Sequence, residues 1–128
     1  MKKSESTSQS TNHPVRLQIK MRLNDGVIGP GKIELLTYLA QEGSITAAAR
    51  KMNMNYRRAW HLIHTLEMAI GISIVETEIG GAGGGGARLT DFGKELVERF
   101  QEMKANMETV SVEFTDWLES SIQTSSGK

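Results

Sequence analysis

The 128-residue sequence has no cysteine, only two prolines and few aromatic residues, which make up 5% of the chain. Without cysteine the chain can form neither disulfides nor thiolate metal sites. No apolar run is long enough to span a bilayer, and no apolar signal segment follows the N-terminal lysines. These absences predict a cytoplasmic protein that does not bind membranes, and a hydrophobic content of 38% suffices for the core of one domain.

An excess of charge of either sign is also missing, because 15 basic residues balance 15 acidic residues. Nucleic-acid-binding domains usually have a basic excess, so the neutral total by itself argues against one. The distribution is uneven, however, since residues 44–70 contain four basic residues against one acidic residue and residues 91–119 contain three against eight. This pattern predicts a basic binding face and an acidic face turned away from the partner.

The N-terminal part divides into a polar tail and a strand. Residues 1–14 are rich in Ser, Thr and Gln and lack the apolar groups that would offset the entropy of ordering, so we expect a disordered tail. From Val15 to Leu23 apolar and polar residues alternate, which predicts a strand. The turn signal Asp25-Gly26 is expected to end this strand.

Three helices are predicted in the middle of the chain. Gly43 and Gly71 can adopt the left-handed conformation that ends a helix, and Ser44 and Asn55 are good N-caps. Residues 53–55 form a tight turn between the second and third helices. The predicted helices span about residues 32–42, 45–52 and 56–70.

The third of these helices is amphipathic. Its apolar stripe, spaced by four, three and four residues, consists of Ala59, Ile63, Leu66 and Ile70. Its opposite face contains Tyr56, Arg57, Arg58, His61, His64 and Thr65. An Ala-rich helix, a three-residue turn and a helix with a basic start together indicate a DNA-binding helix-turn-helix, whose second helix enters the major groove. The alternative is that the arginines only form a solvated surface.

A hairpin with a glycine-rich loop is expected next, with strands at residues 72–79 and 87–89 and the loop at residues 80–86. Glycines let backbone N–H groups approach an anion, so a nucleotide-binding loop is the alternative. The Lys-Ser/Thr pair and the helix that such a loop requires are missing. We therefore interpret the loop as the tip of a wing that lies on the DNA backbone.

Metal binding and catalysis find little support in the sequence. His61, His64 and Glu67 are spaced three apart and could in principle hold a metal, but no second cluster of ligands exists. No nucleophile, base and orienting residue are spaced as a catalytic unit. We therefore predict no metal site, no catalytic residues, no cofactor and no enzymatic activity.

Thr90 is expected to cap a long final helix at about residues 91–118. Apolar residues spaced by four and three along it form what we call the apolar seam: Leu96, Phe100, Met103, Met107, Val110, Phe114 and Trp117. This period of 3.5 is typical of a helix that pairs with another helix. A helix lying on its own domain is the alternative, but a domain this small has little surface to cover the seam. We therefore predict a homodimer, with antiparallel pairing because the Glu-rich flanks would repel each other if parallel.

From Leu35 to Phe100 the sequence resembles the DNA-binding domain of the ModE-type molybdate-responsive transcriptional regulators and, more distantly, that of the LysR type. The matching residues are Gly43-Ser44-Ile45, Ala48-Ala49, Tyr56-Arg57, Ala59-Trp60, Val75-Glu76, the glycine-rich run 80–86 with Ala87, Leu89-Thr90 and Gly93. The resemblance implies a winged helix-turn-helix in a single-domain member of the family.

Two departures limit what the resemblance implies. Full-length members continue into oxyanion-binding domains that sense molybdate, and we expect no such domain and no molybdate binding in this chain. The family's wing usually has basic residues where this chain has Thr77 and Ala82, which leaves Arg88 as the basic residue of the wing. Wing contacts to phosphate are therefore expected to be weaker here.

The expected fold class is mainly α with a small β-hairpin, a winged helix-turn-helix followed by a long dimerisation helix. We assign residues 15–119 to this domain and residues 120–128 to a second disordered tail. The expected function is transcription regulation by a homodimer that binds an inverted repeat in double-stranded DNA. The candidate DNA-binding residues are Ser44, Thr46, Asn55, Tyr56, Arg57, Arg58, His61 and Arg88. The alternative is a protein–protein adaptor that retains the winged-helix fold.

Overall fold

The computed structural model describes residues 14–78 and 85–126, with side chains up to residue 123. The tail expected at residues 1–14 and most of the loop expected at residues 80–86 lie outside the described residues. The wing-tip interpretation of that loop therefore stays a prediction.

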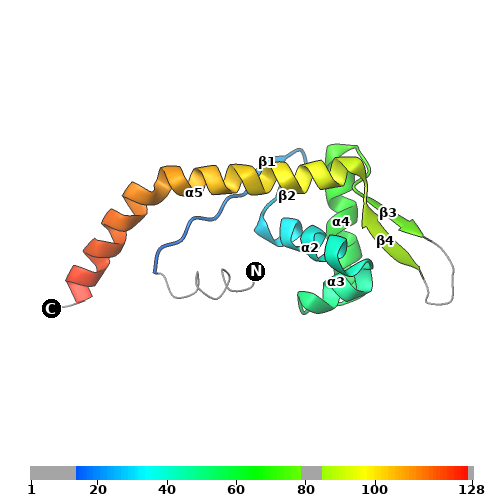
Figure 1. Ribbon diagram of the computed structural model, residues 1–128, viewed down its shortest axis with the longest axis horizontal. Helices are drawn as coiled ribbons and strands as arrows, with labels where there is room; N and C mark the ends of the chain where they lie inside the picture. Colours follow the sequence, from blue (N-terminus) through cyan, green and yellow to red (C-terminus); the bar gives the residue numbers. More distant parts are fainter. Residues whose placement is uncertain (1–13, 79–84, 127–128) are drawn as a thin grey trace. The chain divides into compact units, whose positions relative to one another are not determined.

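Figure 1 shows the elements in chain order: a first hairpin, three consecutive helices, a second hairpin and a long final helix. Residues 19–102 form one compact unit, and residues 103–128 belong with residues 1–18 to another, so that the final helix contributes to both. The elements are β1 (Met21–Leu23), β2 (Gly26–Ile28), α2 (Pro30–Glu42), α3 (Ile45–Lys51), α4 (Tyr56–Ile70), β3 (Val75–Glu78), β4 (Gly86–Leu89) and α5 (Asp91–Ser126).

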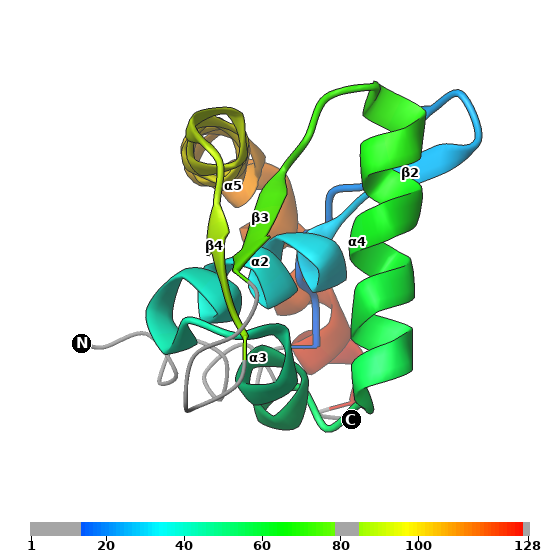
Figure 2. The same ribbon diagram turned by 90° about the vertical axis from the view of Figure 1, so that its right-hand side faces the viewer.

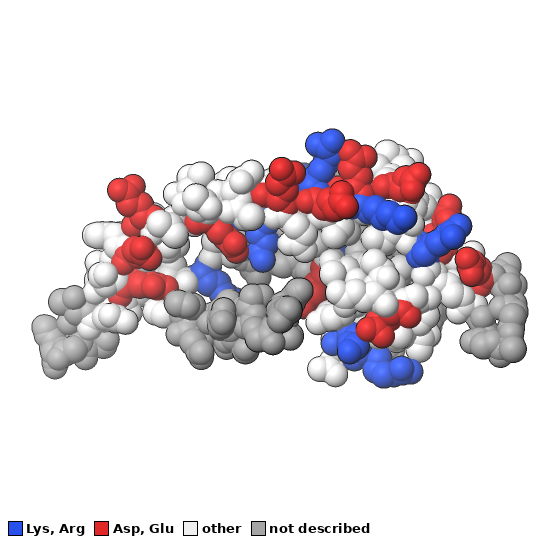
Figure 3. Space-filling view, in the orientation of Figure 1, with Lys and Arg blue, Asp and Glu red and all other residues white. Residues whose placement is uncertain are grey.

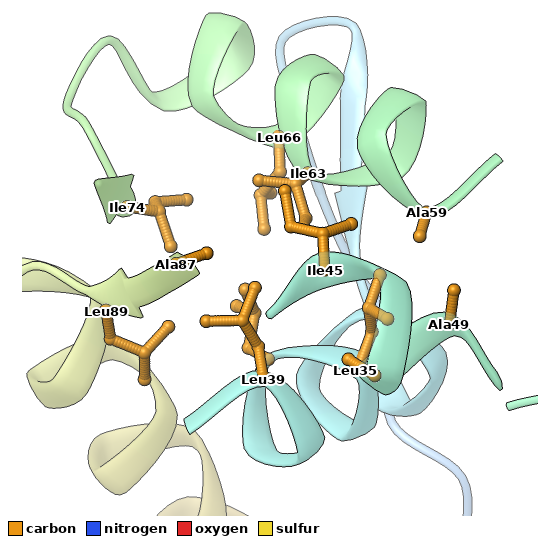
Figure 4. Close-up of a cluster of buried hydrophobic side chains, with 12 residues drawn as sticks. Leu35, Leu39, Ile45, Ala49, Ala59, Ile63, Leu66, Ile74, Ala87 and Leu89 are labelled. Carbon is orange, nitrogen blue, oxygen red and sulfur yellow. The ribbon is translucent and has the colours of Figure 1, made fainter. Parts of the chain in front are cut away.

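The core of residues 19–102 lies between α2, α3, α4 and the second hairpin. In Figure 4 apolar side chains from these elements point toward one another. The expected stripe of α4 is confirmed, because Ala59, Ile63 and Leu66 are buried and Ile70 packs against the edge of the cluster. The buried cluster consists of Leu35, Leu36, Leu39, Ile45, Ala48, Ala49, Ala59, Ile63, Leu66, Ile74, Ala87 and Leu89. Burial of this stripe fixes which face of α4 points away from the core.

The ends of these helices follow the sequence closely. Gly43 and Gly71 end α2 and α4 with φ values of 82° and 85°, in the left-handed region that glycine occupies without steric cost. Asn53 has a φ of 57° in the turn between α3 and α4, a conformation that asparagine tolerates better than most residues. The tight turn therefore brings α4 directly after α3, and the two helices pack together.

The first hairpin is shorter than the predicted strand. Only Met21–Leu23 pair as β1, with the three residues of β2, and Val15 to Lys20 have no strand partner. An alternating pattern forms a strand only where another backbone can satisfy its N–H and C=O groups, and β2 is too short for more. Apart from the turn signal Asp25-Gly26, no pattern in the sequence indicated β2.

Polar contacts attach this hairpin to the two neighbouring helices. The Asn24 side chain in its turn donates a hydrogen bond of 2.9 Å to the carbonyl of Ala69, near the end of α4. Lys32 Nζ, on the first turn of α2, donates to the carbonyl of Val27 at 2.9 Å, and partial burial lowers the pKa of Lys32. Figure 2 shows α4 with α3 near one end and β2 near the other.

The second hairpin is the wing. Its strands are antiparallel, with Val75 opposite Leu89 and Glu78 opposite Gly86, and β3 is shorter than the predicted 72–79. One Glu67 oxygen accepts hydrogen bonds from the N–H groups of Ile74 and Val75, at 2.8 and 3.0 Å. A single carboxylate on α4 therefore holds the start of the wing.

The final helix begins as predicted and ends later than predicted. Thr90 caps it, since the Thr90 hydroxyl accepts a hydrogen bond of 3.0 Å from the N–H of Gly93. The helix continues to Ser126, beyond the expected end at residue 118, so residues 120–126 are helical where a disordered tail was expected. The reason is visible in the sequence, because no proline or glycine interrupts the chain between Gly93 and Gly127.

The fold class is the one that the sequence predicted: mainly α, with a small wing hairpin after a helix-turn-helix and a long helix at the end. The first hairpin, β1 and β2, is an addition that the prediction lacked. Among the described residues, no helix combines the length and the apolar character needed to cross a membrane.

Candidate nucleic-acid interface

The start of α4 forms an exposed, basic surface. A hollow, called here the α4 hollow, is lined by Tyr56, Arg57, Arg58, Trp60 and His61. The buried stripe orients α4 so that these side chains point outward, and Tyr56 and Trp60 are among the exposed large hydrophobic residues. Four of the predicted DNA-binding residues therefore lie together, where guanidinium, phenol and imidazole groups can bind phosphates and base edges.

Trp60 is the residue of this hollow that the sequence analysis did not select. Its indole ring stacks on the imidazole of His64, with ring centroids 4.5 Å apart and an angle of 13° between the planes. A signal was available, since Trp60 is a large aromatic residue outside the stripe of Ala59, Ile63 and Leu66. Its exposed indole is therefore available for a contact with a partner outside the domain.

The predicted α3 residues lie at the other half of the helix-turn-helix. The Ser44 hydroxyl accepts a hydrogen bond of 3.0 Å from the N–H of Ala47, and Thr46 is exposed on the first turn of α3. The Ser44 hydroxyl can still donate its own hydrogen to a phosphate while it caps the helix. Ser44 and Thr46 are thus placed where the first helix of such a motif crosses the DNA backbone.

Basic and acidic side chains are separated on the surface. Figure 3 shows Lys and Arg side chains over the end of α3, where the last turn contains Arg50 and Lys51, and mostly acidic side chains along α5. One carboxylate lies near the basic group, because Glu42 is 4.0 Å from the ammonium of Lys51. The basic middle and acidic end of the sequence therefore correspond to different elements.

Asn55 has a structural task that restricts its predicted role. Its Oδ1 accepts a hydrogen bond of 2.8 Å from the N–H of Arg58 and so caps α4. Bidentate pairing with adenine needs both the oxygen and the nitrogen of the amide. With the oxygen in use, the Asn55 amide nitrogen can still donate to a phosphate, which leaves a supporting contact.

Arg88, the predicted contact of the wing, is paired within the hairpin. Its Nε lies 3.0 Å from Glu76 Oε1 on the neighbouring strand, and both side chains are exposed. Exposed pairs of this kind contribute about 0–1 kcal/mol, so a phosphate can compete for Arg88. The carboxylates of Glu76 and Glu78 nevertheless make the described part of the wing less attractive to DNA than the α4 hollow.

Two of the three residues considered as a metal site have other contacts, and the third, His61, lines the α4 hollow. Glu67 accepts hydrogen bonds from the start of the wing, and His64 stacks on Trp60. No group of three or more histidine, cysteine, aspartate or glutamate side chains in the described ranges could hold a metal ion.

The predicted dimerisation residues divide into two groups. Leu96 packs against the core cluster, and Phe100 is only 6% exposed in the single chain. Leu96 and Phe100 therefore follow the alternative stated above, in which the helix lies on its own domain. Met103 is half-buried, and the members from residue 107 onward are exposed, namely Met107, Val110, Phe114 and Trp117. Dimerisation through the exposed part stays a prediction.

Residues 31–94, from the start of α2 to the first turn of α5, match the sequence profile of the family of bacterial regulatory helix-turn-helix proteins of the lysR type. The chain belongs to this family. The matched segment of this lysR-family chain contains the whole helix-turn-helix, the wing and every residue of the α4 hollow.

Curated relatives confirm the resemblance to ModE-type regulators. The molybdenum-pterin-binding protein MopA of Rhodobacter capsulatus is 37% identical over 73 residues, 57% of this lysR-family chain and 28% of MopA. The DNA-binding transcriptional dual regulator ModE of Escherichia coli K12 is 37% identical over 71 residues, 56% of this chain and 27% of ModE. The chain thus spans under a third of the length of these relatives.

Among solved structures, a chain in the crystal structure of the CbnR_DBD-DNA complex is similar over 63% of this chain and 91% of its own length. The TM-score is 0.49 and the sequence identity is 20%.

Proposed function

We propose that this chain is a transcription regulator that binds a specific inverted-repeat sequence in double-stranded DNA as a homodimer. The observation that carries the proposal is the α4 hollow, which places two arginines, a tyrosine and a histidine on the outer face of the second helix of a helix-turn-helix. This helix enters the major groove in such motifs. Membership of a family of bacterial regulators supports the same conclusion.

The proposal gives each predicted contact a role. Arg57 reads a guanine through two hydrogen bonds, while Tyr56, Arg58 and His61 contact phosphates or base edges beside it. Ser44, Thr46 and Asn55 bind the DNA backbone next to α4, and Arg88 binds it through the wing. No molybdate site is assigned to the described residues.

The homodimer rests on the exposed part of α5. Met107, Val110, Phe114 and Trp117 follow the spacing of a helix that pairs with a second helix, and all four are exposed in the single chain. Two-fold symmetry then places two copies of α4 in successive major grooves, about 34 Å apart on one side of the duplex. A symmetric protein of this kind requires an inverted repeat.

Selection of bound fragments from genomic DNA, followed by affinity measurements at several salt concentrations, tests the proposal. A DNA reader enriches one sequence and loses affinity steeply as salt increases, because bound cations are released from the phosphates. A protein adaptor, the second candidate function, enriches no sequence. Enrichment of no sequence would contradict the proposal, and an enriched sequence without inverted symmetry would contradict the homodimer.

Arg57→Ala then tests the role of α4. We expect specific binding to weaken by about 1–3 kcal/mol and the preference at one position of the site to relax. Arg22→Ala is the control, since Arg22 is an exposed arginine on β1. If binding to single-base variants of the site gives the same preference profile for Arg57→Ala as for the wild type, Arg57 does not read a base.

A further inference from the structure

Trp60 is a large aromatic side chain on the outside of α4, with 44% of its surface exposed. The residue next to it, Ala59, is fully buried, and Ile63 and Leu66, about one and two turns further on, are buried as well, which shows that Trp60 points away from the core. Tryptophan is highly buried on average because its exposure to water is costly. The stability of the domain therefore does not explain why an indole occupies this position.

The orientation of the indole is fixed by a neighbour. Tyr56, Trp60 and His64 are spaced by four residues and so form one row along α4, with a rise of about 6 Å from one to the next. The Trp60 and His64 rings lie nearly parallel at 4.5 Å. One face of the indole thus stacks on His64, and Trp60 lines the α4 hollow together with Arg57 and His61.

The surroundings of Trp60 specify a ligand that is both anionic and locally apolar. Arg57 and Arg58 line the same hollow, and the single carboxylate of α4, Glu67, is engaged with the N–H groups of Ile74 and Val75. In the DNA major groove, the phosphates provide the negative charge and the 5-methyl group of thymine is the apolar group on the base edges. No other base edge offers an indole an apolar contact of this kind.

We propose that Trp60 is a specificity-determining residue that contacts thymine methyl groups in the major groove, with His64 as the positioning residue that holds the indole. This inference rests on the proposed DNA-binding function and extends it. Trp60 lies one turn after Tyr56, so its row reaches the bases adjacent to those that Arg57 reads. The preferred half-site therefore contains a thymine next to the base pair recognised by Arg57.

The test uses the full chain and the site selected from genomic DNA, with each thymine replaced in turn by deoxyuridine, which lacks only the methyl group. We expect one or two replacements per half-site to weaken wild-type binding by about threefold to fivefold each, the effect of losing one buried methyl group. We expect the Trp60→Ala protein to bind the site with equal affinity whether these positions contain thymine or deoxyuridine. Trp60→Phe keeps part of the discrimination, because phenylalanine is still an apolar contact.

His64 variants separate positioning from simple loss of affinity. We expect His64→Ala to reduce the ratio of thymine to deoxyuridine affinity, and His64→Phe to preserve it, because a phenyl ring can stack on the indole. Circular dichroism checks that each variant is folded, and we expect all of them to fold because Trp60 is exposed.

Fluorescence provides a second readout of the same contact. In a Trp117→Phe chain, Trp60 is the remaining tryptophan, and we expect DNA binding to change its fluorescence.

The outcomes distinguish this inference from the proposed function. If the wild type binds the selected site with equal affinity whether it contains thymine or deoxyuridine, Trp60 does not read a methyl group although the protein binds DNA. A selected half-site without thymine overturns the inference in the same way. Failure to select any sequence contradicts the proposed function itself.

Discussion

The helices α4 and α5 are both amphipathic, and the single chain covers the apolar stripe of α4 but only the first part of the apolar seam of α5. The stripe of α4 lies in the core from Ala59 to Leu66, and the outer face of this helix is basic and aromatic. The apolar seam of α5 begins in contact with the core at Leu96 and continues to Trp117, where it is exposed. The surface around that seam is mainly acidic.

This difference indicates what each helix contacts outside the chain. On α4 the exposed groups are cationic and can form hydrogen bonds, which suits the phosphates and base edges of DNA. On α5 the exposed groups are large and apolar at regular spacing, which suits an identical helix. An acidic surface repels DNA, so the two helices cannot exchange these tasks.

The largest effect is expected from a charge in the exposed part of the apolar seam. Phe114 is 61% exposed in the single chain, and Phe114→Glu would bury a carboxylate if two copies of α5 pair. We expect a monomer that binds the inverted repeat about 10²–10⁴-fold more weakly, because the second half-site is no longer bound by a linked copy. Sedimentation at micromolar concentration measures the association state.

A matched control lies two residues away. Val112 is 53% exposed and is outside the spacing of the apolar seam, so Val112→Glu adds the same charge to another side of the same helix. The Val112→Glu protein is expected to remain a dimer with nearly unchanged DNA affinity. A wild type that sediments as a monomer, or two variants that behave alike, would show that α5 does not pair through the apolar seam.

A second prediction compares the two phenylalanines of the apolar seam. Phe100 is buried in the single chain, so Phe100→Ala should lower the free energy of unfolding by about 3–5 kcal/mol at any protein concentration. Phe114→Ala should lower it only where the protein is dimeric, and the loss should vanish on dilution. Urea unfolding at two protein concentrations measures both. A concentration-independent loss for Phe114→Ala would place that side chain in the core of one chain.

Local signals predicted most of the fold. Gly43, Gly71, Ser44 and Asn55 begin and end helices where their backbone or side-chain chemistry predicts. The strand at residues 15–23 was predicted too long, because an alternating pattern does not reveal how much partner strand exists. Sequence periodicity likewise placed Phe100 and Phe114 on one seam, since spacing cannot distinguish a helix face covered by the same chain from one that is exposed.

The sequence located part of the α4 hollow but not the contacts that its neighbouring residues make. Charge and position identified Arg57 and Arg58, which line the hollow, but the capping bond of Asn55 and the pairing of Arg88 with Glu76 depend on three-dimensional contacts. Trp60 was not among the candidate DNA-binding residues, although it lies outside the apolar stripe that the sequence predicted for α4. The burial of its neighbours and the 44% exposure of Trp60 itself show that its indole faces outward.

The smallest predicted effect tests the charges of the two helices directly. Arg58 lines the α4 hollow, whereas Arg99 lies on α5 with its Nε 2.8 Å from Glu95 Oε2, and both side chains are exposed. Arg58→Gln and Arg99→Gln each remove one positive charge while keeping a residue of good helix propensity.

If Arg58 contacts a phosphate, its loss should weaken binding several-fold for all sequences and reduce the magnitude of the slope of log affinity against log salt by about 0.9. If α4 and not α5 binds the DNA, Arg99→Gln should leave that slope unchanged. Titrations at four or more salt concentrations measure both slopes, and an equal decrease in the two variants would mean that the protein attracts DNA through its total charge instead of through α4.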